Sequence, residues 1–330
     1  MSLTGAPAKP PRFAIVDVLR GAAIVAMVIY HCAWDLSYFQ LIPIDITVDT
    51  GWRIFQHLIL GGFLLLVGVS LVLAHGRGIR WPSFWRRFAM IAAGAAAVTI
   101  GTYILFPETF VFFGILHAIA LFSLMALPFL RLPPWLTALV GAVFLIVPLF
   151  FSNVAFNDPR IAWIGFWEVP PATNDLVPIF PWFGMVLVGM ALARLVLASP
   201  LATTIAAWKP ASILRPLIVL GRWSLIIYLV HQPILLGIIY PIANARPADA
   251  PTRVDSFVSS CVATCKANGN TDDHCTAYCG CAVERIVRDD LWSVIEQPTS
   301  SPEQNAAIAD IARQCTATMP SNLGVTPPAR

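Results

Sequence analysis

The stretch DVLRGAAIVAMVIYHCAWD, residues 17–35, decides the fold class. It is apolar over a length that can cross a membrane, because about 20 helical residues at 1.5 Å each span the ~30 Å hydrocarbon core. Four ionisable side chains nevertheless lie within it: Asp17, Arg20, His31 and Asp35. Ionisable groups inside a span are rare and usually face a cavity or a partner. The stretch therefore predicts a membrane helix that also carries a functional site.

Helical phase places these four side chains along one side of the helix. Arg20 and His31 are separated by about three turns and ~20° of rotation, so they share a face at depths roughly 16 Å apart. Asp17 and Asp35 are separated by about five whole turns and stand ~60° from Arg20. Two simpler readings stay open: a local ion pair between Asp17 and Arg20 at the interface, and a structural hydrogen-bonding role for His31. A polar stripe of this length favours the wall of a cavity.

The composition supports an integral membrane protein. Of 330 residues, 58% are hydrophobic and only 12% are charged, and the mean hydropathy is +0.74. A soluble domain carries roughly 25% charged residues. The net charge of +3 is not concentrated in a long basic tract, so we expect no nucleic-acid partner. The N-terminus lacks the layout of a cleavable signal peptide, and we expect the first apolar run to be a retained helix.

Apolar runs predict an all-α, polytopic membrane bundle of about seven transmembrane helices. The sequence shows no internal repeat. The seven segments are 14–36, 54–75, 88–106, 110–130, 134–152, 178–198 and 216–240.

The composition becomes polar near residue 245, which predicts a bundle domain over 1–244 and a small cysteine-rich helical tail over 245–330. The two C-x-x-x-C pairs around NGN suit a helical hairpin with two disulfides. Nested pairing would join Cys261 to Cys279 and Cys265 to Cys275, and would leave Cys281 for Cys315. Fifteen connectivities are open to six cysteines. A zinc site that uses these thiolates and His274 is the alternative, although we expect disulfides and no metal.

Basic residues in the short loops predict the orientation. If the N-terminus is cytoplasmic, the inner side receives Lys9, Arg12, Arg77, Arg80, Arg86, Arg87, Arg131, Lys209 and Arg215. The outer loops before the tail then receive only Arg53 and Arg160. Seven spans place the tail outside, the compartment in which disulfides form. We expect a multi-pass protein of a bacterial inner membrane with a periplasmic tail.

Further polar residues lie in or near the other spans. His117 lies in the fourth, where bonding between helices is the simpler reading. The stretch GRWSLIIYLVHQPIL in the seventh carries Arg222, Ser224, Tyr228 and His231, and helical spacing puts Tyr228 and His231 on one side. His57 lies nearer the end of its span, which favours an interfacial role.

One basic cluster is a candidate anion site. The stretch HGRGIRWPSFWRR places Arg77, Arg80, Arg86 and Arg87 around two tryptophans on the predicted cytoplasmic side. The simpler interpretation is positive-inside anchoring. The functional one is a site for a phosphorylated ligand, since guanidinium groups bind phosphate in two-pronged geometry.

Several motifs together resemble a known family. DVLRGAAIVAMVIYH, FLLLVGVSL, FGILHAIA, FPWFGMVLVGMAL and GRWSLIIYLVHQPIL follow one another in the order found in the bacterial branch of the heparan-alpha-glucosaminide N-acetyltransferase catalytic-domain family. The resemblance covers residues 12–240 and has no counterpart for the tail. The spacing of Arg20 and His31 is also similar to membrane acyltransferases that O-acetylate bacterial surface glycans.

The resemblance implies an acetyl-CoA-dependent acyltransferase that moves acetyl from the cytoplasmic donor to an amine or hydroxyl of an extracytoplasmic sugar. His31 would be the base or the acetyl carrier, Arg20 would orient the donor or stabilise the thioester oxyanion, and Asp17 would hold Arg20. Asp35, His57, His117, Tyr228 and His231 would line the substrate path. Arg20 and the four arginines of the basic cluster would bind the phosphates of CoA.

Two points of the resemblance stay open. In lysosomal members the histidine assigned as acetyl carrier follows the first helix, whereas this chain has no histidine there before His57. Either His31 or His57 does the chemistry, or the acetyl-histidine step is absent. The acceptor and the choice between N- and O-acetylation are also open, and a homo-oligomer is compatible with the sequence.

The competing hypothesis is a transporter that uses the polar side of the first helix as a permeation path. Many transporters consist of repeats with discontinuous helices in corresponding positions. The lack of a repeat in this chain argues against that class, and binding of CoA would separate the two.

Overall fold

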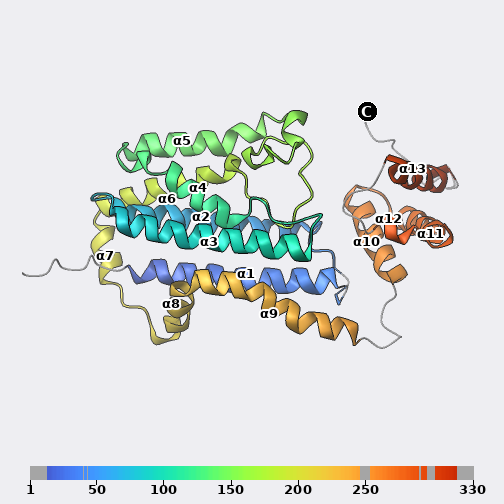
Figure 1. Ribbon diagram of the computed structural model, residues 1–330, viewed down its shortest axis with the longest axis horizontal. Coiled ribbons are helices and arrows are strands. Elements are labelled where there is room, and N and C mark those ends of the chain that lie inside the picture. The colour runs from blue at the N-terminus through green and yellow to red at the C-terminus, as the bar shows by residue number, and fades with distance from the viewer. Residues whose placement is uncertain are drawn as a thin grey trace, which may run out of the picture. The chain divides into compact units, whose positions relative to one another are not determined.

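The computed structural model describes residues 13–39, 41–42, 44–245, 253–289, 291–295 and 302–317 (Figure 1). Regular secondary structure in these ranges is helical throughout, which confirms the predicted fold class. Lys9 and Arg12, which entered the topology prediction, lie outside the described residues. Within the described ranges, five helices are long and apolar enough to cross a membrane: α1 (Ala14–Tyr38), α2 (Thr50–His75), α3 (Trp81–Leu105), α6 (Ile179–Ala198) and α9 (Ser224–Asn244).

Two of the seven predicted segments form shorter helices. Predicted segment 110–130 yields α4 (Ile115–Met125) and a 3-10 turn at Pro128–Leu130. Predicted segment 134–152 yields α5 (Pro134–Ile146), which continues as a 3-10 helix at Val147–Leu149. Proline lacks the N–H group that an internal α-helical position requires, so Pro128 and Pro148 fall in the 3-10 turns.

The predicted seventh segment is divided. Helix α8 (Arg215–Arg222) ends before Trp223, and α9 begins at Ser224 and runs through Pro233 and Pro241. Between α6 and α8 lie α7 (Leu201–Ala207) and a 3-10 turn at Ser212–Leu214. Two further 3-10 turns, Val154–Asn157 and Ala162–Ile164, occupy the long connection before α6.

Contacts group the chain into two units. The first contains Met1–Ile29 and Phe55–Gln232, and the second contains Tyr30–Ile54 and Pro233–Arg330. The core of the first unit is built by α2, α4 and α6, where Phe122 and Phe183 are buried with ring centroids 5.4 Å apart. The predicted domain boundary between residues 244 and 245 stays a prediction.

Glycines allow the helices of the first unit to approach closely. A Cβ atom on Gly68 of α2 would lie 2.0 Å from the carbonyl oxygen of Val186 of α6. A Cβ atom on Gly189 of α6 would lie 2.2 Å from the carbonyl oxygen of Leu65. Small residues at such crossings are typical of membrane bundles, since they let two backbones pack against each other.

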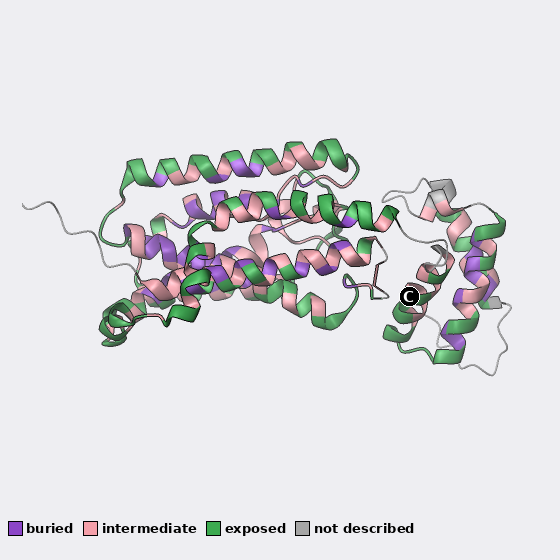
Figure 2. Cartoon of the chain, turned by 90° about the horizontal axis from the view of Figure 1, so that it is seen from below, coloured by how far each residue is buried: buried purple, intermediate pink, exposed green. Residues whose placement is uncertain are grey.

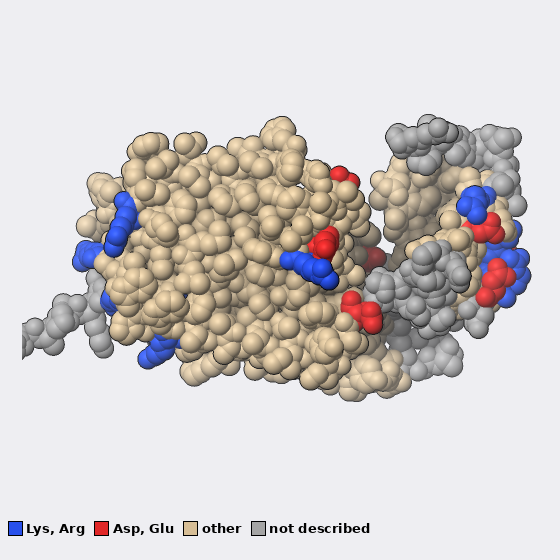
Figure 3. All heavy atoms as spheres, turned by 45° about the horizontal axis from the view of Figure 1, so that its top comes forward, with Lys and Arg blue, Asp and Glu red and all other residues tan. Residues whose placement is uncertain are grey.

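The outward sides of the helices are apolar. Figure 2 shows buried residues on the inner sides of the bundle helices and exposed residues on their outer sides. Large hydrophobic side chains on these outer sides are exposed, among them Ile100, Ile104, Leu139 and Leu195. In Figure 3 most of the bundle surface is uncharged, with Lys and Arg mainly at one end and a basic group beside acidic groups near the other. Such a surface suits lipid, and the chain is a membrane protein.

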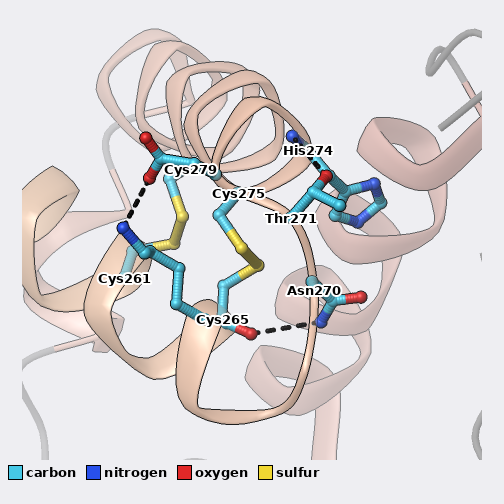
Figure 4. Close-up of a disulfide and its surroundings, with 9 residues drawn as sticks. Cys261, Cys265, Asn270, Thr271, His274, Cys275 and Cys279 are labelled. Atoms are coloured by element: carbon cyan, nitrogen blue, oxygen red, sulfur yellow. Dashed lines mark hydrogen bonds and ion pairs between the residues drawn. A yellow bond between two sulfur atoms is a disulfide. The ribbon is translucent and has the colours of Figure 1, made fainter.

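The tail is a disulfide-bonded helical hairpin (Figure 4). Helices α10 (Arg253–Ala267) and α11 (Asp272–Arg288) are joined by Cys261–Cys279 and Cys265–Cys275, and Cys281–Cys315 joins α11 to α13 (Pro302–Ala317). The nested pairing is therefore confirmed. A cysteine in a disulfide offers no thiolate, so these six residues do not form the alternative zinc site.

Local sequence explains the hairpin. Gly269 has φ +86° in the turn, a conformation that glycine adopts without strain. Thr271 then caps α11 by accepting a hydrogen bond from the His274 N–H group, as Figure 4 shows. Beyond α11, the short helix α12 (Trp292–Ile295) brings the ring of Trp292 to 5.7 Å from that of Phe257. The tail thus has a small apolar core besides its disulfides.

Candidate functional site

A cavity of about 320 Å³ lies among six helices of the first unit: α1, α2, α3, α4, α8 and α9. Most of its wall is apolar, and α4 contributes Ile115, Leu116 and Ile119. Its polar side chains are Arg20, Ser70, Arg87, Arg222, Ser224 and Tyr228. An apolar cavity with a few convergent polar groups is the usual form of a small-molecule site.

Arg20 is held by neighbours on two helices. Its Nη1 lies 3.3 Å from Oδ1 of Asp17, so the predicted ion pair at positions i and i+3 is present. Its Nη2 donates a 2.8 Å hydrogen bond to the hydroxyl group of Ser70 on α2. These contacts restrict the guanidinium group at the cavity wall, which reduces the entropy lost when it binds an anion.

Arg222 reaches the cavity because α8 packs tightly on α1. A Cβ atom on Gly21 would lie 2.0 Å from the carbonyl oxygen of Leu217, and one on Gly221 would lie 2.0 Å from that of Asp17. Nε of Arg222 lies 3.5 Å from Oδ2 of Asp17. Asp17 therefore pairs with arginines of two helices. The sequence marked Arg222 only as a polar residue of the seventh segment, and we did not expect it in the anion site. Its position directly after Gly221 was the available signal for a close helix crossing there.

Of the basic cluster between α2 and α3, only Arg87 lines the cavity, where its charge interacts with that of Arg20. Arg77, Arg80 and Arg86 are exposed. Adjacent helical residues point about 100° apart, which explains why Arg86 and Arg87 differ. Arg80 instead donates from Nε to the carbonyl oxygen of Ala74 over 3.1 Å.

His117 and His231 hydrogen-bond outside the cavity lining. The hydroxyl group of Thr99 donates to the carbonyl oxygen of Val111 and lies 3.2 Å from Nε2 of His117. Because that hydroxyl has a single proton, Nε2 of His117 must be the donor to it. Nδ1 of His231 lies 2.7 Å from the carbonyl oxygen of Tyr228, which assigns the Nδ1 proton and makes Nε2 of the neutral ring an acceptor.

The other predicted residues are not among those that line this cavity. His57 of α2 is exposed, with its ring centroid 5.6 Å from that of Trp182. His31 and Asp35 belong to the second unit, on the later turns of α1. The ring of His31 is 5.8 Å from that of Tyr30, and Asp35 is fully buried. A fully buried carboxyl group in a membrane span is energetically costly. Its presence favours a functional role for this side of α1.

Asp175 was not predicted as a site residue. In the sequence it is one acidic residue in a predicted outer loop, and no motif or spacing connects it to the other candidates. Its Oδ2 accepts a 2.9 Å hydrogen bond from the N–H group of Ile115, at the start of α4. Burial raises the pKa of this carboxyl group to about 6, and the Ile115 hydrogen bond opposes the rise. A carboxyl group with such a pKa can change its charge near neutral pH.

Comparison with known families gives one match. The family model described as "Heparan-alpha-glucosaminide N-acetyltransferase, catalytic" matches residues 12–233, well over half of the 330 residues. The matched range includes every residue that lines the cavity, together with His31 and His57, and excludes the disulfide-bonded tail. No curated protein and no solved structure matches the chain.

Proposed function

The chain belongs to the heparan-alpha-glucosaminide N-acetyltransferase catalytic family, and we propose that it transfers acetyl from cytoplasmic acetyl-CoA to an amine or hydroxyl of an extracytoplasmic sugar. The observation that carries the proposal is the cavity in which Arg20, Arg87 and Arg222 converge on an apolar wall. Three guanidinium groups suit the phosphates of CoA, and the apolar wall suits its uncharged arm.

The lining of the cavity supports a narrower donor site than the basic cluster alone. Arg20 and Arg87 would bind the donor phosphates together with Arg222, and Ser70 would support Arg20. Arg77, Arg80 and Arg86 are exposed and would attract the polyanionic donor from solution without contacting it in the cavity. This division follows from helical phase on α3 and from the crossing of α8 over α1.

His31 is the proposed base or acetyl carrier. It lies on α1 about three turns beyond Arg20 on nearly the same face, roughly 16 Å along the axis. Acetyl-CoA has a long arm between its phosphates and its thioester, so phosphate binding and chemistry at different depths are compatible. His57 is the alternative, and Asp35, His117, Tyr228 and His231 are proposed to line the acceptor path.

The proposed topology follows the charge of the loops. Arg77, Arg80, Arg131 and Lys209 lie between helices and Arg215 begins α8, all in the connections predicted for one end of the seven apolar segments, which favours a cytoplasmic position. The N-terminus is then cytoplasmic and the tail periplasmic, in a bacterial inner membrane. The three disulfides of the tail support an oxidising compartment.

The test is transfer of labelled acetyl from acetyl-CoA to a glucosamine-terminated oligosaccharide in membranes that contain the chain. The variants are His31→Ala and His57→Ala, and we expect only the first to lose transfer. Product that resists hydroxylamine indicates an amide, and product that is cleaved indicates an ester. Full activity of His31→Ala contradicts the role of His31, and lack of CoA binding by the unaltered chain contradicts the proposed function.

A further inference from the structure

The segment that carries Asp175 is paired with the chain before α4. The N–H group of Asn174 donates to the carbonyl oxygen of Thr109 over 2.8 Å, and that of Val177 donates to Phe113 over 3.0 Å. Phe113 and Leu176 form a parallel β-bridge. These contacts link residues more than sixty positions apart and bring Asp175 to the first turn of α4.

The carboxyl group of Asp175 fits closely at this helix end. Oδ2 accepts the Ile115 N–H bond, and a Cβ atom on Gly114 would lie 2.4 Å from the same oxygen. Only glycine at position 114 therefore leaves room for the carboxyl group in this arrangement. The N-terminus of a helix favours a negative charge, because its N–H groups lack partners and its dipole is positive.

The same helix end belongs to the cavity. Ile115 lines the cavity, and so does Tyr228 of α9. Asp175 itself does not line the cavity, so any influence on a bound ligand passes through Ile115 and the first turn of α4.

We propose that Asp175 is a positioning residue for acetyl transfer, whose ionised carboxyl group fixes the start of α4 and with it Ile115 and Leu116 at the cavity wall. The inference rests on the proposed function. An ionised carboxyl group makes a shorter and stronger hydrogen bond to an N–H group than a neutral one. A cavity wall that is fixed before the donor binds holds the donor in one geometry, and correct placement of the donor raises the rate of transfer.

Other titratable groups on the surrounding elements have partners of their own. His117 of α4 bonds to Thr99, and the ring of Tyr103 of α3 packs 5.4 Å from that of Phe110. Residues 109–113 contain no acid or base. The charged groups of the cavity are its three arginines, which keep their charge at all pH values of interest.

The sign of the pKa shift separates a positioning role from simple helix capping. A capping carboxyl group with a lowered pKa adds stability as pH rises. Burial instead raises the pKa of Asp175 to about 6. Between about pH 4 and pH 6 the folded state thus binds more protons than the unfolded state, so stability falls as pH rises. The ionised group costs stability, which is common for groups kept for function.

The experiment compares Asp175→Asn, Asp175→Ala and a control, Thr173→Val, in the full chain. Asparagine keeps an oxygen that can accept from Ile115 but has no charge. Thr173→Val removes hydroxyl hydrogen bonds to the carbonyl oxygens of Phe110 and Asp175 but keeps the Asp175 carboxyl group, so it separates a disturbed segment from a lost charge. The readouts are kcat and KM for acetyl-CoA between pH 5 and pH 8, and thermal stability over the same range.

For the unaltered chain and the control, we expect kcat to rise with a midpoint near pH 6 while thermal stability falls. Asp175→Asn should lower kcat roughly tenfold at pH 7.5 with little change in KM, and it should be more stable at pH 7.5. Its kcat should keep only the part of the rise with pH that the proposed base, His31, contributes. Asp175→Ala should raise KM as well. A wild-type pH profile and kcat in Asp175→Asn overturns the inference.

Failure of the proposed function is recognised separately, because the unaltered chain would then neither bind CoA nor transfer acetyl. In that case hydrogen exchange at the first-turn amides of α4 reports on Asp175. Faster exchange in Asp175→Ala supports its positioning of α4, and unchanged exchange contradicts it.

Discussion

Arg20 of α1 donates a 2.8 Å hydrogen bond to Ser70 of α2, fifty residues further along the chain. The Ser70 hydroxyl group donates in turn to the carbonyl oxygen of Leu66 over 2.6 Å, within its own helix. The serine oxygen is therefore oriented as an acceptor for the guanidinium group. This hydrogen bond and the ion pair with Asp17 together fix the orientation of the Arg20 guanidinium group at the cavity.

Replacement of Ser70 by alanine should weaken CoA binding roughly tenfold, because a hydrogen bond to a charged group contributes about 1.5–3 kcal/mol. Equilibrium binding of CoA to the purified chain measures the effect. Ser123→Ala is the matched control, since Ser123 is also buried and also bonds to a carbonyl oxygen one turn back, that of Ile119. Equal losses in the two variants would contradict the role of Ser70.

Removal of single arginine charges should divide the basic residues into two groups. Arg87→Gln and Arg222→Gln should weaken CoA binding by roughly one to two orders of magnitude, because both side chains line the cavity. Arg77→Gln and Arg86→Gln should change affinity by less than about threefold, since neither lines the cavity and salt screens their charge. Arg222 is exposed as well, so its place in the cavity lining is what distinguishes it from these two. Similar losses for all four would favour a diffuse basic surface over a defined anion site.

The crossing of α2 and α6 should tolerate no side chain at Gly68. Gly68→Ala places a methyl group against the carbonyl oxygen of Val186, and overpacking of this kind costs about 1–3 kcal/mol. Gly62→Ala on the same helix has open space and should be neutral or slightly stabilising. Thermal unfolding in detergent compares the two, and equal stability would show that α2 and α6 are further apart.

The three disulfides should contribute unequally to the tail. Cys281–Cys315 spans 34 positions and Cys265–Cys275 spans 10. On the chain-entropy account, the longer loop gains about 1 kcal/mol more. Replacing the Cys281–Cys315 pair by alanine should therefore speed proteolysis of the tail more than replacing the Cys265–Cys275 pair. Cys32→Ser is the control, because Cys32 is a free thiol.

Local sequence patterns were sufficient to predict much of the fold. Apolar runs predicted the long helices, the C-x-x-x-C pairs predicted the hairpin, and the spacing of Asp17 and Arg20 predicted their ion pair. The break at Trp223 and the short α4 were not predicted. The chain between residues 216 and 240 is apolar enough for one helix, and its division accompanies the packing of α8 on α1 through Gly21 and Gly221.

The sequence by itself determined that the chain is a membrane protein, that one side of α1 is polar, and that six cysteines of the tail can pair. Hydropathy and helical period act over neighbouring residues, so these features can be recognised without the fold. Only the tertiary structure decided that Arg222 and Arg87 join Arg20, and that Asp175 meets Ile115. Those pairs depend on how helices cross and on pairing between residues some sixty positions apart, such as Phe113 and Leu176. Contacts between distant segments leave no periodic signal in the chain, so they become visible only when it is folded.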